Sequence, residues 1–171
     1  MQTSKARKFM LLFVTMASVL AFCATASLAQ GKVKVKFRAF AVVTKMEKLE
    51  VDDTKGHVVG ITENKGVTSD GKFVRYFTSR SDLIKGNGTL SGYGKYVEVK
   101  DGDAYFVKFD GTANTTKSPE GKLKITFKGT YSYTKGTGKY ENIQGGGTFS
   151  GGYIGKGIMF VDVEGEYSIR K

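Results

Sequence analysis

The sequence has very few of the side chains that bind soft metals or form cross-links. Among its 171 residues there is one cysteine, Cys23, one histidine, His57, one proline and no tryptophan. A lone histidine and a lone cysteine cannot supply the ligands of a tetrahedral zinc site, and a lone cysteine closes no disulfide within the chain. His57 follows a turn at the start of a predicted strand, a position typical of a surface or edge residue. We therefore predict no metal and no other cofactor, and a stability that comes from the core alone.

Phosphate-binding motifs are also missing, although one stretch is rich in glycine. Residues 136–152 read GTGKYENIQGGGTFSGG, and GKG follows at 155–157. The Walker pattern requires Ser or Thr where Gly157 stands, and the dinucleotide pattern requires a helix that nothing in this stretch predicts. We interpret these glycines as β-bulges and barrel corners, where a side chain would obstruct tight curvature.

Residues 1–29 have the three-part composition of a secretory signal peptide. A basic start precedes an apolar run that is too short for a good membrane span, and the small residues Ser27 and Ala29 form a cleavage site. Cleavage near Ala29 would deliver an exported protein, periplasmic or extracellular. Two alternatives stay open. One is an uncleaved N-terminal anchor, and the other is a lipoprotein modified at Cys23, against which the bulky Phe22 argues because a small residue normally precedes the lipidated cysteine.

Residues 30–171 have the size of a single domain and a basic composition. Their 142 residues suit one hydrophobic core, and loss of the three basic residues in 1–29 lowers the net charge from +11 to +8. A positive charge attracts anionic surfaces, whereas lysines spread over solvent-exposed faces serve solubility. The lysines here are dispersed, which favours the second interpretation. Because export is expected, nucleic acid is not expected as a partner.

Apolar and polar residues alternate along most of this domain, which predicts strands with one buried and one exposed face. In 122–134, polar residues stand between the apolar residues Leu123, Ile125, Phe127, Tyr131 and Tyr133. Turn sequences divide the chain into eight predicted strands. They lie near 32–43, 57–67, 72–82, 88–99, 104–114, 122–134, 146–154 and 157–169.

No part of the domain has a convincing helical period. The best candidate, TKMEKLEVDD at residues 44–53, fits a strand and a turn equally well. A sheet without helices to cover its edges usually closes on itself or folds into a sandwich. Long strands joined by short turns favour an all-β fold, a single antiparallel eight-stranded β-barrel, whose interior holds side chains or one small ligand.

Three segments of the sequence resemble those of a known protein family. DAYFVKFDGT at 103–112, GTGKYENIQGGGTFSG at 136–151 and VEGEY at 163–167 resemble the allene oxide cyclase barrel-like family, small exported barrels related in fold to plant allene oxide cyclases and dirigent proteins. The resemblance covers roughly residues 57–169. It implies an eight-stranded antiparallel barrel, a trimer by analogy with the plant relatives, and an apolar cavity that shapes a reactive intermediate. No catalytic residue of the plant enzymes matches a position here, and a shared fold does not imply a shared reaction.

Two polar side chains are expected among the aromatic residues of the barrel. Arg75 alternates with Phe73 and Phe77 on one face of a strand, and Tyr131 shares its face with Phe127. These five are the predicted ligand-binding residues, and no catalytic residue is predicted. Two roles are open to Arg75: binding a carboxylate inside the cavity, or stacking on the rings as part of the structure.

Acidic residues gather near the C-terminus of the sequence. Asp162, Glu164 and Glu166 alternate with the apolar Val161 and Val163. We expect the three carboxylates on the outer face of the sheet, paired across strands with lysines. A glutamate that instead pointed into an apolar barrel would have a raised pKa and could transfer protons.

The sequence predicts an exported protein that binds a small apolar or amphipathic molecule in its barrel. One alternative is a cofactor-independent isomerase or cyclase on the same barrel, in which a rigid cavity orients a reactive substrate; we favour binding over catalysis. Another is a basic protein that binds a polyanion or an anionic envelope surface. The expected partners are thus a small hydrophobic ligand, further copies of the chain, or an anionic surface.

Overall fold

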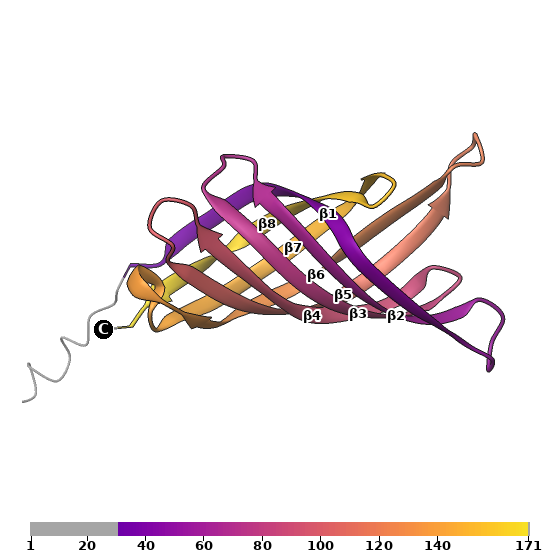
Figure 1. The fold of residues 1–171 in the computed structure, drawn as a ribbon, viewed down its shortest axis with the longest axis horizontal. Coiled ribbons are helices and arrows are strands. Elements are labelled where there is room, and N and C mark those ends of the chain that lie inside the picture. Colours follow the sequence, from indigo (N-terminus) through magenta and orange to yellow (C-terminus); the bar gives the residue numbers. More distant parts are fainter. Residues whose placement is uncertain (1–30, 171) are drawn as a thin grey trace, which may run out of the picture. The chain divides into compact units, whose positions relative to one another are not determined.

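The computed structural model describes residues 31–170, which form one closed antiparallel barrel (Figure 1). Each strand pairs with its neighbour in sequence, and the first pairs with the last. The elements are β1 (Val33–Val51), β2 (His57–Thr68), β3 (Phe73–Ile84), β4 (Asn87–Glu98), β5 (Ala104–Lys117), β6 (Leu123–Gly136), the 3₁₀ turn η1 (Gly138–Tyr140), β7 (Ile143–Gly155) and β8 (Ile158–Ile169).

This architecture confirms the predicted fold class and the number of strands. The predicted signal peptide, residues 1–29, lies outside the described residues. Within residues 31–170, no helix is long and apolar enough to cross a membrane.

β5 ends at Lys117, three residues beyond its predicted end, and two further strands extend beyond their predicted bounds by three residues or more. The segment 44–51, for which helix and strand were both open, continues β1 beyond a register shift between Val43 and Lys45 and pairs with β2 down to Val51 and His57. β7 begins at Ile143 rather than at residue 146. Both extensions lengthen the barrel wall.

Aromatic side chains close one end of the barrel. A core cluster of Tyr96, Tyr105, Val107, Tyr140 and Ile143 is almost fully buried. The rings of Tyr96 and Tyr105 stack with their centroids 4.9 Å apart, and η1 carries Tyr140 onto the edge of Tyr105, at 5.3 Å. Aromatic pairs of this kind add stability beyond the area they bury. We call this cluster the aromatic plug.

The inner face pairs aromatic residues with glycines on neighbouring strands. Gly94 faces Phe77, and a Cβ built on Gly94 would lie 2.2 Å from the ring of Phe77. Other rings lie in the same way over their paired glycines. These pairs are Phe109 over Gly92, Phe149 over Gly129 and Phe127 over Gly151.

The backbone at these corners is also too close for a side chain. A Cβ on Gly129 would lie 2.1 Å from the carbonyl oxygen of Asp110 on β5. In the stretch 136–152 itself, a Cβ on Gly147 would lie 2.0 Å from the carbonyl oxygen of Glu164 on β8, which agrees with the interpretation that a side chain would obstruct these positions. The stretch 136–152 forms the end of β6, η1 and most of β7, so it has no helix to hold a phosphate.

The predicted acidic face is on the outside of the barrel. Arg38 donates to both carboxylate oxygens of Asp162, at 2.7 and 2.8 Å, across the β1–β8 pairing. The other two acids also pair with lysines of this region, Glu164 with Lys36 and Glu166 with Lys32. Exposed pairs contribute little stability each, and all three join β1 or the adjoining Lys32 to β8, where the barrel closes.

We expect Gly94→Ala to destabilise the barrel by about 1–3 kcal/mol, the usual effect of overpacking a core. Phe77 cannot move aside freely, because Tyr96 and Phe109 hold its ring at centroid distances of 5.3 and 5.7 Å. Urea unfolding followed by circular dichroism measures the change. Gly155→Ala is the control, since a Cβ there meets nothing closer than 3.8 Å. Equal unfolding midpoints for the two variants would contradict the packing argument.

Candidate ligand-binding site

A cavity of about 1100 Å³ occupies the barrel between the aromatic plug and the opposite end. Its lining reaches the turns at Gly56, Gly86 and Gly157, which join consecutive strands at that end. Several lining residues at that end are exposed to solvent, among them Met46 by 46%, Ile154 by 60% and Leu123 by 70%. The cavity is therefore open at the end away from the plug. We call this opening the mouth.

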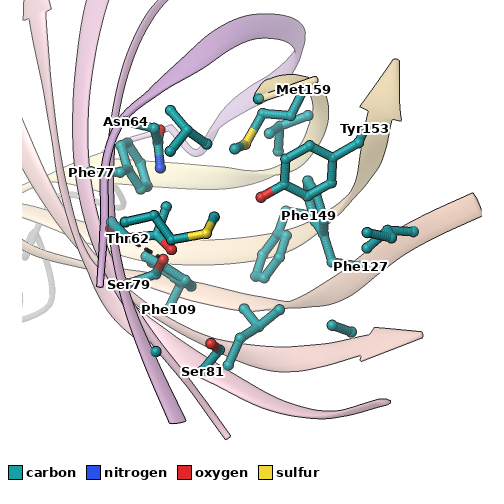
Figure 2. A pocket seen from close by; sticks show the side chains of 18 of the residues that line it. Thr62, Asn64, Phe77, Ser79, Ser81, Phe109, Phe127, Phe149, Tyr153 and Met159 are labelled. Carbon is teal, nitrogen blue, oxygen red and sulfur yellow. Dashed lines mark hydrogen bonds between the residues drawn. The ribbon is translucent and has the colours of Figure 1, made fainter. Parts of the chain in front are cut away.

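The cavity has one polar wall, formed by β2 and β3. Thr62, Asn64, Ser79 and Ser81 point into it, and the hydroxyl of Ser79 donates to the carbonyl oxygen of Thr62 at 3.4 Å (Figure 2). These residues share a face because their strands pair in register, Thr62 with Ser79 and Gly60 with Ser81. We call this set the polar seam.

The opposite wall, from β6, β7 and β8, is apolar. Figure 2 shows Phe127, Phe149, Tyr153 and Met159 on this side, facing the polar seam across the cavity. A wall of rings and a thioether offers no strong hydrogen-bond partner apart from the Tyr153 hydroxyl. The two walls together fit a molecule with one apolar and one polar side.

Arg75 is the charged residue buried most deeply in the cavity lining. It lies on β3 with 3% of its surface exposed, and its guanidinium carbon is 4.1 Å from the centre of the Phe77 ring and 5.9 Å from that of Tyr96. Its Nη2 donates to the side-chain oxygen of Asn64 at 3.4 Å, while Nε and Nη1 have no hydrogen-bond partner within residues 31–170. Burial lowers the pKa of Arg75 from its ordinary value.

Tyr131 supplies a second polar group from β6. Its hydroxyl is buried, has no hydrogen-bond partner among the described residues, and lies over Gly165, where a Cβ would come within 2.7 Å of it. Burial raises the pKa of Tyr131, so at neutral pH the phenol keeps its proton and can donate it to a ligand.

The structure brings four of the five predicted site residues together. Arg75, Phe77, Phe127 and Tyr131 all line the cavity. Phe73 does not; it packs against the aromatic plug, with its ring 5.4 Å from that of Tyr105. Phe73 lies on the same strand as Arg75, two residues closer to the aromatic plug.

Sequence reasoning missed the polar seam. Ser79 and Ser81 continue the alternation of Arg75 and Phe77 on β3, so the pattern itself contained them. Thr62 and Asn64 continue the corresponding face of β2. Small polar residues on an inner face were read as ordinary strand residues because only the pairing of the two strands shows that they face a cavity.

The charged residues that line the cavity within residues 31–170 are all basic. They are Arg75 in its depth and the exposed Lys48 and Lys156 near the mouth. No carboxylate and no imidazole lines the cavity in this part of the chain. The site therefore has a positive potential, neutral phenols and no evident proton acceptor.

An acidic cluster lies away from the cavity, at the β4–β5 turn. Carboxylate oxygens of Glu98, Asp101 and Asp103 lie within 4.8 Å of one another. The ammonium of Lys139 pairs with Glu98 and with Asp101, 3.1 Å from the latter, and the backbone N–H of Lys139 donates to Asp103 at 3.1 Å. Lys139 thus offsets part of the negative charge of this cluster.

With the fold and the cavity described, the chain can be compared with known proteins. No protein-family model matches the sequence, and no curated protein matches it. Among solved structures, the chain is similar to the pterocarpan synthase dirigent protein GePTS1, with 13% identity, a TM-score of 0.45, and coverage of 81% of this chain and 89% of the other. The pairing of β1 with β8 establishes the closed eight-stranded barrel independently of this similarity, and it is the fold that the allene oxide cyclase barrel-like resemblance implies.

His57, predicted to be a surface or edge residue, ties two segments together beside the mouth. Its side chain is only 14% exposed, with Nδ1 2.6 Å from Asp53 of the β1–β2 turn and Nε2 2.8 Å from Asp82 of β3. Both ring nitrogens can donate to carboxylates only when the imidazole is protonated. The hydrogen bond with Asp53, and then that with Asp82, raise the pKa of His57 above its ordinary value of 6.5.

This contact predicts a pH-dependent stability. Because the folded-state pKa is raised, the contribution of His57 is fully present below about pH 6.5 and is lost as the pH rises through the folded value. We expect the urea midpoint of the wild type to fall more between pH 6 and pH 9 than that of His57→Gln. NMR of the single histidine measures its pKa directly. Parallel stability profiles with a histidine pKa at or below 6.5 would refute the contact.

Proposed function

We propose that this protein is an exported binding protein that holds one small apolar or amphipathic molecule inside its barrel. The observation that carries the proposal is the cavity itself: about 1100 Å³, closed by aromatic residues at one end and open at the other. Ligand sites of this size are typically concave, mostly apolar and provided with a few polar groups that fix orientation. The polar seam, Arg75 and Tyr131 are such groups.

The lining supports binding more than catalysis. An isomerase or cyclase that moves a proton needs a base within hydrogen-bond reach of the substrate. The cavity-lining side chains of residues 31–170 include basic and phenolic groups but no carboxylate or imidazole, and burial raises the pKa of Tyr131. A rigid cavity can still orient a reactive molecule, but these residues give it no acid–base pair.

Binding can be tested with an uncharged amphiphile, dodecanol, and the dye N-phenyl-1-naphthylamine, whose emission rises in apolar surroundings. We expect the protein from Gln30 onward to take up about one dye molecule per chain and to release it when dodecanol is added. Little dependence on salt is expected, whereas a polyanion site would weaken steeply as salt rises.

The location of the bound molecule can be tested because the chain has no tryptophan. Phe127→Trp places a fluorescent reporter inside the cavity, and Tyr93→Trp, at a side chain that is 62% exposed on the outer surface, is the matched control. Dodecanol should shift the emission of the Phe127→Trp variant only. Absence of dye uptake, or equal responses from both reporters, would contradict a barrel-binding function.

A further inference from the structure

We propose that the ligand is an apolar carboxylate that enters the barrel with its charged group first and binds Arg75. This inference rests on the proposed function and adds to it the chemical class of the ligand and the direction in which it lies. Its apolar part would extend from Arg75 toward the mouth, along the wall of Phe127 and Phe149.

The first support is the unpaired charge of Arg75. A guanidinium that is 97% buried costs several kcal/mol to desolvate unless an anion pairs with it. Within residues 31–170, the guanidinium donates one hydrogen bond, to the side-chain oxygen of Asn64, and that bond is long, at 3.4 Å. Removing water from a charge without replacing its partners is unfavourable, so a bound carboxylate would provide what the chain does not.

The second support is the way in which Arg75 is held. The guanidinium of Arg75 lies over the ring of Phe77, with its central carbon 4.1 Å from the ring centre. Phe77 is in turn fixed over Gly94. The contact with Phe77 leaves Nε and Nη1 without hydrogen-bond partners and without accessible surface among the described residues, so a carboxylate that forms hydrogen bonds with them must displace a neighbouring side chain. Stacking on an aromatic ring and binding a carboxylate, the two roles that the sequence left open for Arg75, are thus compatible when that side chain moves.

The third support is the charge along the route to Arg75. Lys48 and Lys156, near the mouth, are exposed and carry the same sign as Arg75. Positive groups around an opening draw anions in and repel cations. Within the described residues, no acidic side chain lines the cavity, and the carboxylates of Asp53 and Asp82 beside the mouth are both bound to His57.

The buried position of Arg75 determines which end of the ligand lies deep in the cavity. If the carboxylate stayed at the mouth beside Lys156, the apolar end of the ligand would lie against an unpaired buried guanidinium, which is unfavourable. Tyr131, which also lines the cavity, has a second buried polar group without a hydrogen-bond partner among the described residues. The polar seam then remains for a hydroxyl or carbonyl group further along the ligand.

The test compares three probes with the same alkyl chain: dodecanoate, dodecanol and dodecyltrimethylammonium. Each displaces N-phenyl-1-naphthylamine from the wild type, from Arg75→Met and from Arg75→Lys. We expect the wild type to bind dodecanoate at least roughly tenfold more tightly than dodecanol, as a charge-assisted hydrogen bond provides, and to bind the cation most weakly. Arg75→Met should lose the preference for dodecanoate and keep its affinity for dodecanol, and Arg75→Lys should keep part of the preference.

Arg80→Met is the matched control, because Arg80 is an exposed residue of the same strand. It should behave as the wild type. Lys156→Met tests the opposite orientation: loss of the dodecanoate preference in this variant, with Arg75→Met unaffected, would overturn the head-first arrangement. Circular dichroism and dodecanol binding verify that each variant is folded.

A measurement on the wild type alone keeps the proposal falsifiable if Arg75 variants fail to fold. NMR of dodecanoate labelled with ¹³C at the carboxyl carbon should show a titration midpoint below that of the free acid, because a guanidinium favours the ionised form. A raised midpoint would overturn the proposal. Equal binding of dodecanol and dodecanoate would overturn it while leaving the barrel-binding function in place, and binding of neither probe would overturn both.

Discussion

The packing of aromatic rings against glycines of the adjacent strand is the interaction on which the barrel depends. Each pair, such as Phe77 with Gly94 or Phe149 with Gly129, lets two strands approach and bend where a side chain on both would clash. The rings then lie flat along the wall and do not fill the centre of the barrel. Eight strands are just wide enough for side chains or one ligand, so this arrangement leaves space for a cavity above the aromatic plug.

The same packing of rings against glycines also positions Arg75. Its guanidinium lies on the ring of Phe77, and that ring lies over Gly94, so two strands determine where the positive charge is held. A buried charge without a partner reduces the stability of a fold, and residues kept at such a cost are typical of functional sites. The polar seam beside it and the basic residues at the mouth extend the same chemistry through the cavity.

Strand number, strand faces and the inward direction of Arg75 could be predicted from the sequence, because a period of two is a local property of the chain. The position of each residue along the length of the barrel could not be predicted in this way. Phe73 and Phe77 share one face, but only the stagger of the closed sheet places the first in the plug and the second in the cavity. The contacts of His57 were also hidden, because Asp82 lies 25 residues away in sequence. The polar seam required the register of β2 against β3.

The pairing of β1 with β8 has a consequence for how the barrel assembles. Val33 lies beside Tyr167, so the last interface to form joins segments separated by nearly the whole domain. Every other neighbouring pair of strands is joined by a turn or, between β6 and β7, by η1 and its flanking residues. Closing such a long loop is costly in chain entropy, and pairings between distant segments slow folding. Until that closure, an open sheet has two unpaired edges that invite association with other chains.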